Sequence, residues 1–110
     1  IFSTFFDAAK PATSETEKFI AEFKKAFPDK EPAGVSALGY DAYLLIIDAI
    51  KRANSADPEK IKEAINQTKD FMGASGIVTL DENRNAIKSA VIKQVKNGKF
   101  EYLDTVNPTK

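Results

Sequence analysis

The sequence predicts an α/β fold, because apolar strand-like segments lie near both ends of the chain and three helical patterns lie between them. The strand-like segments are Ile1–Phe6 and Lys99–Leu103. The helical patterns begin near Ser14, Ala33 and Asp57. Helices between strands are typical of α/β and α+β architectures, and the 110 residues suit a single domain.

The first strand and the first helix are defined by local signals. Ile1–Phe6 is β-branched and aromatic and stops at Asp7, which predicts a buried strand. Ser14–Glu17 has the spacing of a capping box and predicts a helix that starts with Ser14 as its cap. The apolar stripe of this helix is expected to lie in the core and consists of Phe19, Ile20, Phe23 and Phe27.

The second helix is unusually apolar. It is expected to begin between Ala33 and Gly39 and to end at Asn54, and it is apolar on nearly every side through Ala42–Ile47. Such a helix must be covered on more than one face. Burying one Leu or Ile is worth roughly 1.5–3 kcal/mol, which is a large share of the roughly 5–15 kcal/mol that stabilise a domain. We therefore expect this helix to need cover that these residues do not fully supply.

The remaining elements are a third helix, a short strand and a closing β-hairpin. Asp57 is placed to cap the third helix, with Pro58 at its first position. Ile77–Leu80 predicts a short strand. Asn97-Gly98 lies between two β-branched or aromatic runs, Ala90–Val95 and Lys99–Leu103, and this is a strong hairpin signal.

Composition excludes several classes of function. The chain has no Cys and no His, so disulfides, thiolate or imidazole metal ligands and His-dependent nucleophiles are excluded. Sixteen basic residues balance sixteen acidic residues, so no overall field attracts nucleic acid. Asp81–Asn85 alternates oxygen side chains as calcium loops do, but Ala86 and Ile92 stand where such a loop needs Gly and Glu. We read this segment as a polar turn and expect neither metal nor cofactor.

Several short segments, in this order and spacing, resemble one protein family. Together they are similar to the C-terminal third of a periplasmic branched-chain amino-acid-binding protein, the leucine/isoleucine/valine-binding type of class I solute-binding protein that serves an ABC importer. The segments are Phe5–Asp7, Phe19–Phe27, Leu38–Ala42, Asp48–Ala53, Asp57–Ala64 and Phe71–Asn83.

The resemblance implies a piece of a two-lobed fold with a hinge between the lobes. Residues 1–7 would be the last core strand of the second lobe, 14–80 would be helices and a strand of the first lobe, and 88–104 would return as a hairpin to the second lobe. Because the chain opens on Ile1 inside a strand-like segment, we expect a fragment of a longer polypeptide. The resemblance also implies that the family's main anchors for the ligand lie outside these residues.

The resemblance also implies function and candidate site residues. It implies a periplasmic or extracytoplasmic receptor that binds an amino acid without catalysis and delivers it to the membrane subunits of an ABC transporter. Tyr40 is the expected cleft-facing aromatic, and Phe6 and Asp7 lie at a strand end beside the hinge. The alternative for Tyr40 is a half-buried helix residue, and the alternative for Asp7 is a turn residue. The neighbouring Asp41 is a candidate for orienting the hinge or capping a helix, and we expect it to make a cap or a structural hydrogen bond.

The residues themselves leave two other function classes open. A carboxylate-based enzyme would need paired acids, but the pairs Glu15/Glu17 and Asp81/Glu82 lie at an expected cap and an expected turn. An interaction module would use the apolar helix and open strand edges to form an oligomer, such as a homodimer that exchanges segments. Because the long helix lacks cover, we expect an oligomer.

Overall fold

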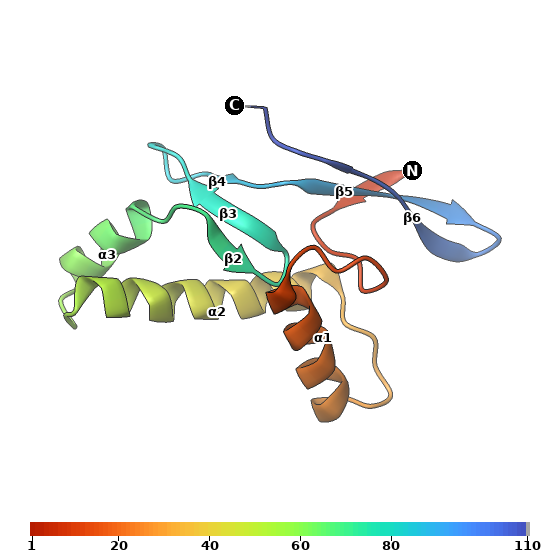
Figure 1. Cartoon of the computed structure of the whole chain (residues 1–110), viewed down its shortest axis with the longest axis horizontal. Coiled ribbons are helices and arrows are strands. Elements are labelled where there is room, and N and C mark those ends of the chain that lie inside the picture. Colours follow the sequence, from red (N-terminus) through yellow and green to blue (C-terminus); the bar gives the residue numbers. More distant parts are fainter. Residues whose placement is uncertain (110) are drawn as a thin grey trace.

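Two small antiparallel sheets and three helices make up the structure, a computed structural model that describes residues 1–109 (Figure 1). One sheet has the strand order β1-β5-β6, formed by β1 (Phe2–Thr4), β5 (Ala90–Lys96) and β6 (Lys99–Val106). Phe2 pairs with Lys93, so the two ends of the chain meet in this sheet. We call these three strands the sheet unit.

The other elements lie between the strands of the sheet unit in sequence and form a second body, the helical unit. Its sheet has the order β2-β3-β4, and the α/β prediction is confirmed. Its elements are α1 (Ser14–Ala26), α2 (Gly34–Ala53), α3 (Pro58–Asn66), β2 (Phe71–Gly73), β3 (Gly76–Leu80) and β4 (Ala86–Ile87).

Helix α1 begins at Ser14, but its cap is Thr13, so the predicted Ser14 cap is wrong. The Thr13 hydroxyl accepts from the backbone N–H of Thr16, and the Thr16 hydroxyl accepts from the N–H of Thr13. The Thr13 hydroxyl also lies 2.8 Å from the carbonyl oxygen of Gly73 and donates to it. This distant contact selects Thr13 over its hydroxyl-bearing neighbour, and local spacing alone does not reveal it.

Helix α2 lies within the predicted bounds, and Asn54 caps its C-terminus in the left-handed conformation with φ of 47°. Its buried face is narrow. An apolar face of α2 remains exposed to solvent. Its large side chains follow a helical spacing and are those of Val35, Leu38, Tyr43, Ile46 and Ile50. The described residues therefore cover α2 on one side only. No helix within residues 1–109 is both long and apolar enough to cross a bilayer.

The third helix, the hairpin and the polar turn follow the sequence prediction. The Asp57 carboxylate accepts from the backbone N–H of Glu59 at 2.9 Å and caps α3. Asn97 and Gly98 join β5 to β6 with φ values of 50° and 73°, as a tight hairpin turn requires. The Asp81 carboxylate closes the polar turn by accepting from two backbone N–H groups, those of Asn83 and Asn85, both at 2.8 Å.

The first strand departs from the prediction of a buried strand. Only Phe2–Thr4 pairs with β5, and Phe2 and Phe5 are 38% and 42% exposed. Phe6 is buried because the chain leaves the sheet at this point and enters the helical unit, where it packs with Phe19, Ala37 and Ala74. The aromatic stripe of α1 is only partly in the core, because Phe27 at its end is 47% exposed.

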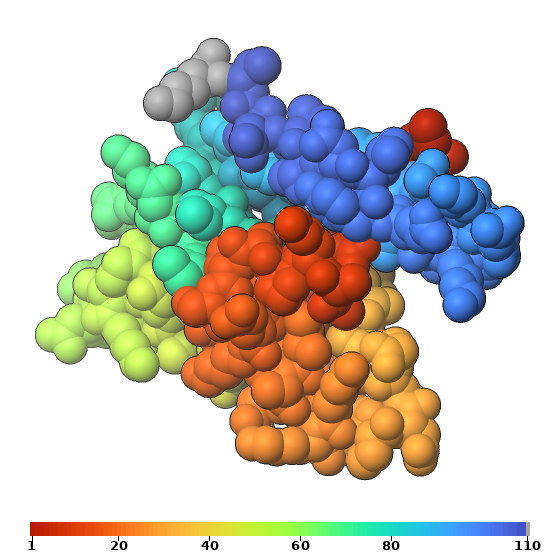
Figure 2. Space-filling view, turned by 45° about the vertical axis from the view of Figure 1, so that its right-hand side comes forward, coloured from red at the N-terminus to blue at the C-terminus, as the bar shows by residue number. Residues whose placement is uncertain are grey.

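The molecule is long and thin for its size. Its radius of gyration is 15.4 Å, whereas a compact chain of this length has about 13 Å. Its accessible surface is 7633 Å², against roughly 6,000 Å² for a compact monomer of this mass. The hairpin tip and α3 lie at opposite ends of the long axis (Figure 1), and the hairpin projects beyond the helices in Figure 2.

Candidate functional site

The two units meet at two connecting segments (Figure 1). The first connector, residues 5–13, runs from the end of β1 to the start of α1. The second connector is only Lys88-Ser89, between the end of β4 and the start of β5. Any site that depends on the relative position of the two units must lie at this junction.

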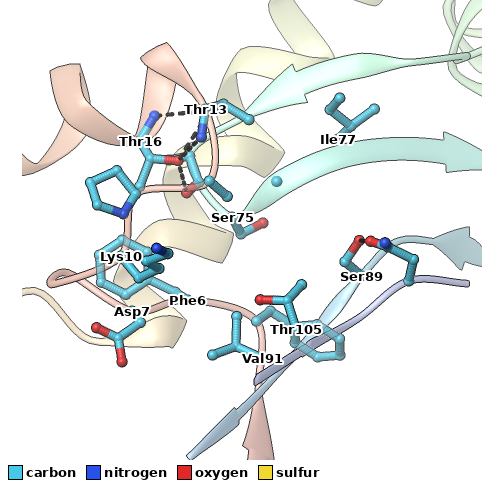
Figure 3. Close-up of a pocket in the computed structure, with 16 residues that line it drawn as sticks. Phe6, Asp7, Lys10, Thr13, Thr16, Ser75, Ile77, Ser89, Val91 and Thr105 are labelled. Carbon is cyan, nitrogen blue, oxygen red and sulfur yellow. Dashed lines mark hydrogen bonds between the residues drawn. The ribbon is translucent and has the colours of Figure 1, made fainter. Parts of the chain in front are cut away.

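Two hollows flank the first connector. The first hollow has a volume of about 320 Å³, and Figure 3 shows Thr13, Ser75 and Thr105 reaching it from three different segments. The second hollow, of about 700 Å³, lies between β1 and the residues that lead into α2, 31–34. Phe6 and Asp7 line both hollows, whereas Tyr40 lines neither.

Asp7 is buried and its carboxylate already has two partners. One oxygen accepts from the backbone N–H of Ala9 at 2.8 Å, which is the turn contact expected of a strand-ending Asp. The other lies 2.9 Å from Nζ of Lys93 on β5, and the two side chains are only 5% and 17% exposed. Asp7 therefore anchors the first connector to the sheet unit, and its role in holding a ligand stays a prediction.

Phe6 and Tyr40 are linked through one ring of α1. The Phe6 ring packs edge-on against Phe19, with ring centres 5.7 Å apart. Tyr40 packs against the same Phe19 ring at 5.0 Å. The structure thus places Phe6 and Tyr40 against the same Phe19 ring, Phe6 in the core of the helical unit and Tyr40 packed against that core.

The hydroxyl of Tyr40 is held by an acidic side chain. It donates to Oε1 of Glu15 at 2.8 Å. Burial, followed by the hydrogen bond and the negative charge of Glu15, raises the pKa of Tyr40 to about 12. The phenol is therefore a neutral donor that ties α2 to the first turn of α1. Its role as a cleft-facing aromatic stays a prediction.

Asp41 makes the structural contacts that the sequence suggested, but with partners 33 and 34 residues away. Its carboxylate accepts from the backbone N–H groups of Ala74 at 2.5 Å and Ser75 at 2.8 Å, and also from the Ser75 hydroxyl. A Cβ at Gly73 would lie 2.5 Å from the same carboxylate, so only glycine leaves room for it. Asp41 therefore fixes the turn between β2 and β3.

The same turn, residues 73–76, is also held from α1. Thr13 donates to the carbonyl oxygen of Gly73 at 2.8 Å, and Thr16 donates to that of Ala74 at 2.9 Å. Sequence reasoning missed this cluster. The pairs Thr13/Gly73 and Thr16/Ala74 are about 60 residues apart in the chain, and Thr16 is a weak capping signal by itself.

Glu15 and Asp81, two acidic residues outside this cluster, have structural partners. Glu15 holds the Tyr40 hydroxyl, and backbone hydrogen bonds from Asn85 and Asn83 lower the pKa of Asp81. Residues 1–109 contain no group of three or more acidic side chains arranged to hold a metal ion.

Comparison with known proteins gives a consistent result. Residues 1–99 match the family model described as periplasmic binding protein. A leucine-binding protein, LivK, from Thermotoga maritima is 46% identical over 97% of this chain, with a TM-score of 0.89, and the match covers 30% of that protein.

Two further solved structures match at 28% identity. The branched-chain amino acid transporter substrate-binding protein LivJ from Streptococcus pneumoniae, in complex with isoleucine, has a TM-score of 0.85 over 97% of this chain. An ABC transporter substrate-binding protein from Desulfitobacterium hafniense, in complex with Leu, has a TM-score of 0.80 over 92% of this chain. In both cases the match covers 30% of the other protein, so this chain spans less than a third of the structures it resembles.

Proposed function

Because this chain belongs to the periplasmic binding protein family, we propose that it is the C-terminal part of an extracytoplasmic receptor that captures an amino acid for an ABC transporter. The observation that carries the proposal is the 46% identity, over nearly the whole chain, to a leucine-binding protein. The matched family consists of solute-binding proteins, which are not enzymes. We infer a branched-chain amino acid as the ligand and the transporter's membrane subunits as the partner.

We propose that the sheet unit belongs to one lobe of this receptor and the helical unit to the other. Residues 1–7 and 88–104 would contribute to the second lobe, and 14–80 to the first. The support is that β1 pairs with β5, which lies near the opposite end of the chain, while the elements between them build a sheet of their own. Ligand sites between two lobes work by opening and closing around the ligand.

The exposed face of α2 supports the view that further polypeptide completes the first lobe. Val35, Tyr43, Ile46 and Ile50 follow a helical spacing and remain in water. A helix this apolar is normally covered on more than one face. The solved relatives are more than three times as long as this chain and have the additional residues to provide that cover.

Phe6, Asp7 and Tyr40 remain our proposed residues near the ligand. Phe6 and Asp7 line the second hollow, which lies between the two units, and this supports a place beside the cleft for both. Tyr40 packs against the Phe19 ring and lines neither hollow, and we propose it as the cleft-facing aromatic of the complete receptor. The main anchors for the ligand are proposed to lie in the rest of the receptor.

The direct test is isothermal titration calorimetry of this chain with leucine and isoleucine. We expect no measurable heat of binding, because the proposed anchors for the ligand's charged groups lie outside these residues. The leucine-binding protein of Thermotoga maritima, titrated under the same conditions, is the positive control. Micromolar binding by this chain alone would contradict the proposal that its anchors lie elsewhere.

The exposed face of α2 also favours a second candidate, an oligomeric interaction module without a small-molecule ligand. The accessible surface exceeds that of a compact monomer by roughly 1,600 Å², and a stable interface needs only about 800 Å² per partner. Light scattering, which gives the molar mass of the chain in solution, tests this module. A dimer that Ile46→Glu dissociates, while Lys62→Glu on α3 does not, would favour this module. A monomer would favour the receptor.

A further inference from the structure

Lys88 occupies the shorter of the two connections between the units. It lies on the two-residue second connector, directly after β4, and its side chain is half-buried. Its Nζ donates to the hydroxyl of Ser75 in the β2–β3 turn. The same Nζ lies 4.9 Å from the centre of the Phe5 ring on the first connector. One side chain therefore contacts both connectors and the helical unit.

The contact continues from Ser75 into α2. The Ser75 hydroxyl accepts from Lys88 and donates to the Asp41 carboxylate, and Ser75 and Asp41 are only 4% and 6% exposed. The carboxylate is fixed in turn by the backbone N–H groups of Ala74 and Ser75. A chain of hydrogen bonds thus runs from the second connector through a rigid turn to the second helix.

The next residue, Ser89, binds the second connector to the sheet unit. Its hydroxyl donates to the side-chain oxygen of Asn107 at 2.8 Å, just beyond β6. Lys88 therefore holds the connector to the helical unit, and Ser89 holds it to the end of the sheet unit. With only two residues between β4 and β5, a change in the angle between the units has to strain or break one of these contacts.

The negative charge of Asp41 favours the protonated form of Lys88 that makes this contact, although burial of Lys88 opposes that form. Burial lowers the pKa of Lys88, while the negative charge of Asp41 favours its protonated form. Within residues 1–109 Lys88 forms no direct ion pair, and the Ser75 hydroxyl lies between it and Asp41. Losing the ammonium would leave the Ser75 hydroxyl and the Asp41 carboxylate without their positive neighbour.

We propose that Lys88 is a latch: its contact with Ser75, supported by Asp41, sets the angle between the sheet unit and the helical unit. Release of this contact frees the second connector to pivot. The inference concerns the junction within this chain, and only its relevance to ligand capture rests on the proposed function.

The test measures the distance between the two units by electron paramagnetic resonance of paired spin labels. The chain has no natural Cys, so Glu63→Cys on α3 and Glu101→Cys on β6, both exposed positions, give specific labelling. The labelled parent is compared with Lys88→Met, which keeps the length of the side chain, and with Ser75→Ala. Lys69→Met, at an exposed lysine of the helical unit, is the matched control.

We expect one narrow distance peak for the parent and for Lys69→Met. In Lys88→Met and in Ser75→Ala we expect a broad distribution of distances instead. The distance distribution of the double variant Lys88→Met/Ser75→Ala should be no broader than that of Lys88→Met, since both changes break the same contact. A parent-like narrow peak in Lys88→Met would overturn the latch. If Lys88→Met does not fold by circular dichroism, Ser75→Ala decides by the same criterion. No ligand is present, so failure to bind an amino acid would leave this result unaffected.

Discussion

Replacing Gly73 with alanine presses a methyl group against the buried Asp41 carboxylate. The added Cβ would lie 2.5 Å from one carboxylate oxygen, 2.7 Å from the other and 2.6 Å from the carbon that joins them. These separations are far below van der Waals contact. The Asp41 carboxylate has to move, but Asp41 is in the middle of α2 and three donors hold its side chain in place.

The expected cost follows from those three donors. A hydrogen bond to a charged group contributes about 1.5–3 kcal/mol, and a buried donor left without a partner costs about 1–3 kcal/mol. Displacing Asp41 weakens all three bonds and leaves the N–H groups of Ala74 and Ser75 poorly satisfied. We therefore expect Gly73→Ala to lower the free energy of unfolding by about 3 kcal/mol or more, a large part of the roughly 5–15 kcal/mol of a typical domain.

Urea unfolding followed by far-UV circular dichroism measures this change. Gly39→Ala is the matched control, because a Cβ at Gly39 has no atom within 4 Å and the residue is inside α2. A glycine replaced by alanine inside a helix gains roughly 0.5–1 kcal/mol, so the two variants should shift the urea midpoint in opposite directions. An unchanged or higher midpoint for Gly73→Ala would refute the role we assign to Asp41.

Three further predictions test individual contacts. Thr13→Ala should lower the free energy of unfolding by about 1 kcal/mol through loss of the α1 cap, whereas Ser14→Ala should change it by less than about 0.5 kcal/mol. A larger loss in Ser14→Ala than in Thr13→Ala would indicate that Ser14 is the cap. Asp7→Asn should cost about 3 kcal/mol because it leaves Lys93 buried without its partner, and adding Lys93→Met should recover part of that loss; equal urea midpoints for Asp7→Asn and the parent would contradict the pair. In a spectrophotometric titration, Tyr40→Phe should remove a phenol step near pH 12. The Tyr40 phenol binds its proton more tightly in the folded chain than in the unfolded chain, where its pKa is near 10.0. The contribution of Tyr40 to stability should therefore be complete below pH 10 and disappear by about pH 12. A stability difference between the parent and Tyr40→Phe that does not change with pH across that range would contradict this prediction.

The elements that were predicted from sequence are those with strong local signals. Asp57-Pro58 predicted the start of α3, and Asn97-Gly98 predicted the hairpin. The apolar run of α2 predicted a helix that these residues do not fully cover. Each signal acts within a few residues through capping, a positive φ or helical periodicity. For these elements the structure adds the direction in which each one is exposed.

The contacts that were missed join residues far apart in the chain. The β2 strand has only three residues and ends in Gly73, so neither its composition nor its length distinguished it from a loop. The cap of α1 was assigned to Ser14, because the contact between Thr13 and Gly73 has no local signature. The latch at Lys88 was missed for the same reason, since Ser75 precedes it by 13 residues.

The most direct test of the receptor proposal is the leucine affinity of a hybrid protein, measured by calorimetry. In this hybrid, our chain replaces the matching 30% of the leucine-binding protein from Thermotoga maritima, to which it is 46% identical. We predict a monomer that binds leucine within about tenfold of the parent receptor, a difference of about 1.4 kcal/mol. A folded, monomeric hybrid that does not bind leucine would contradict the proposal that this chain completes an amino-acid receptor.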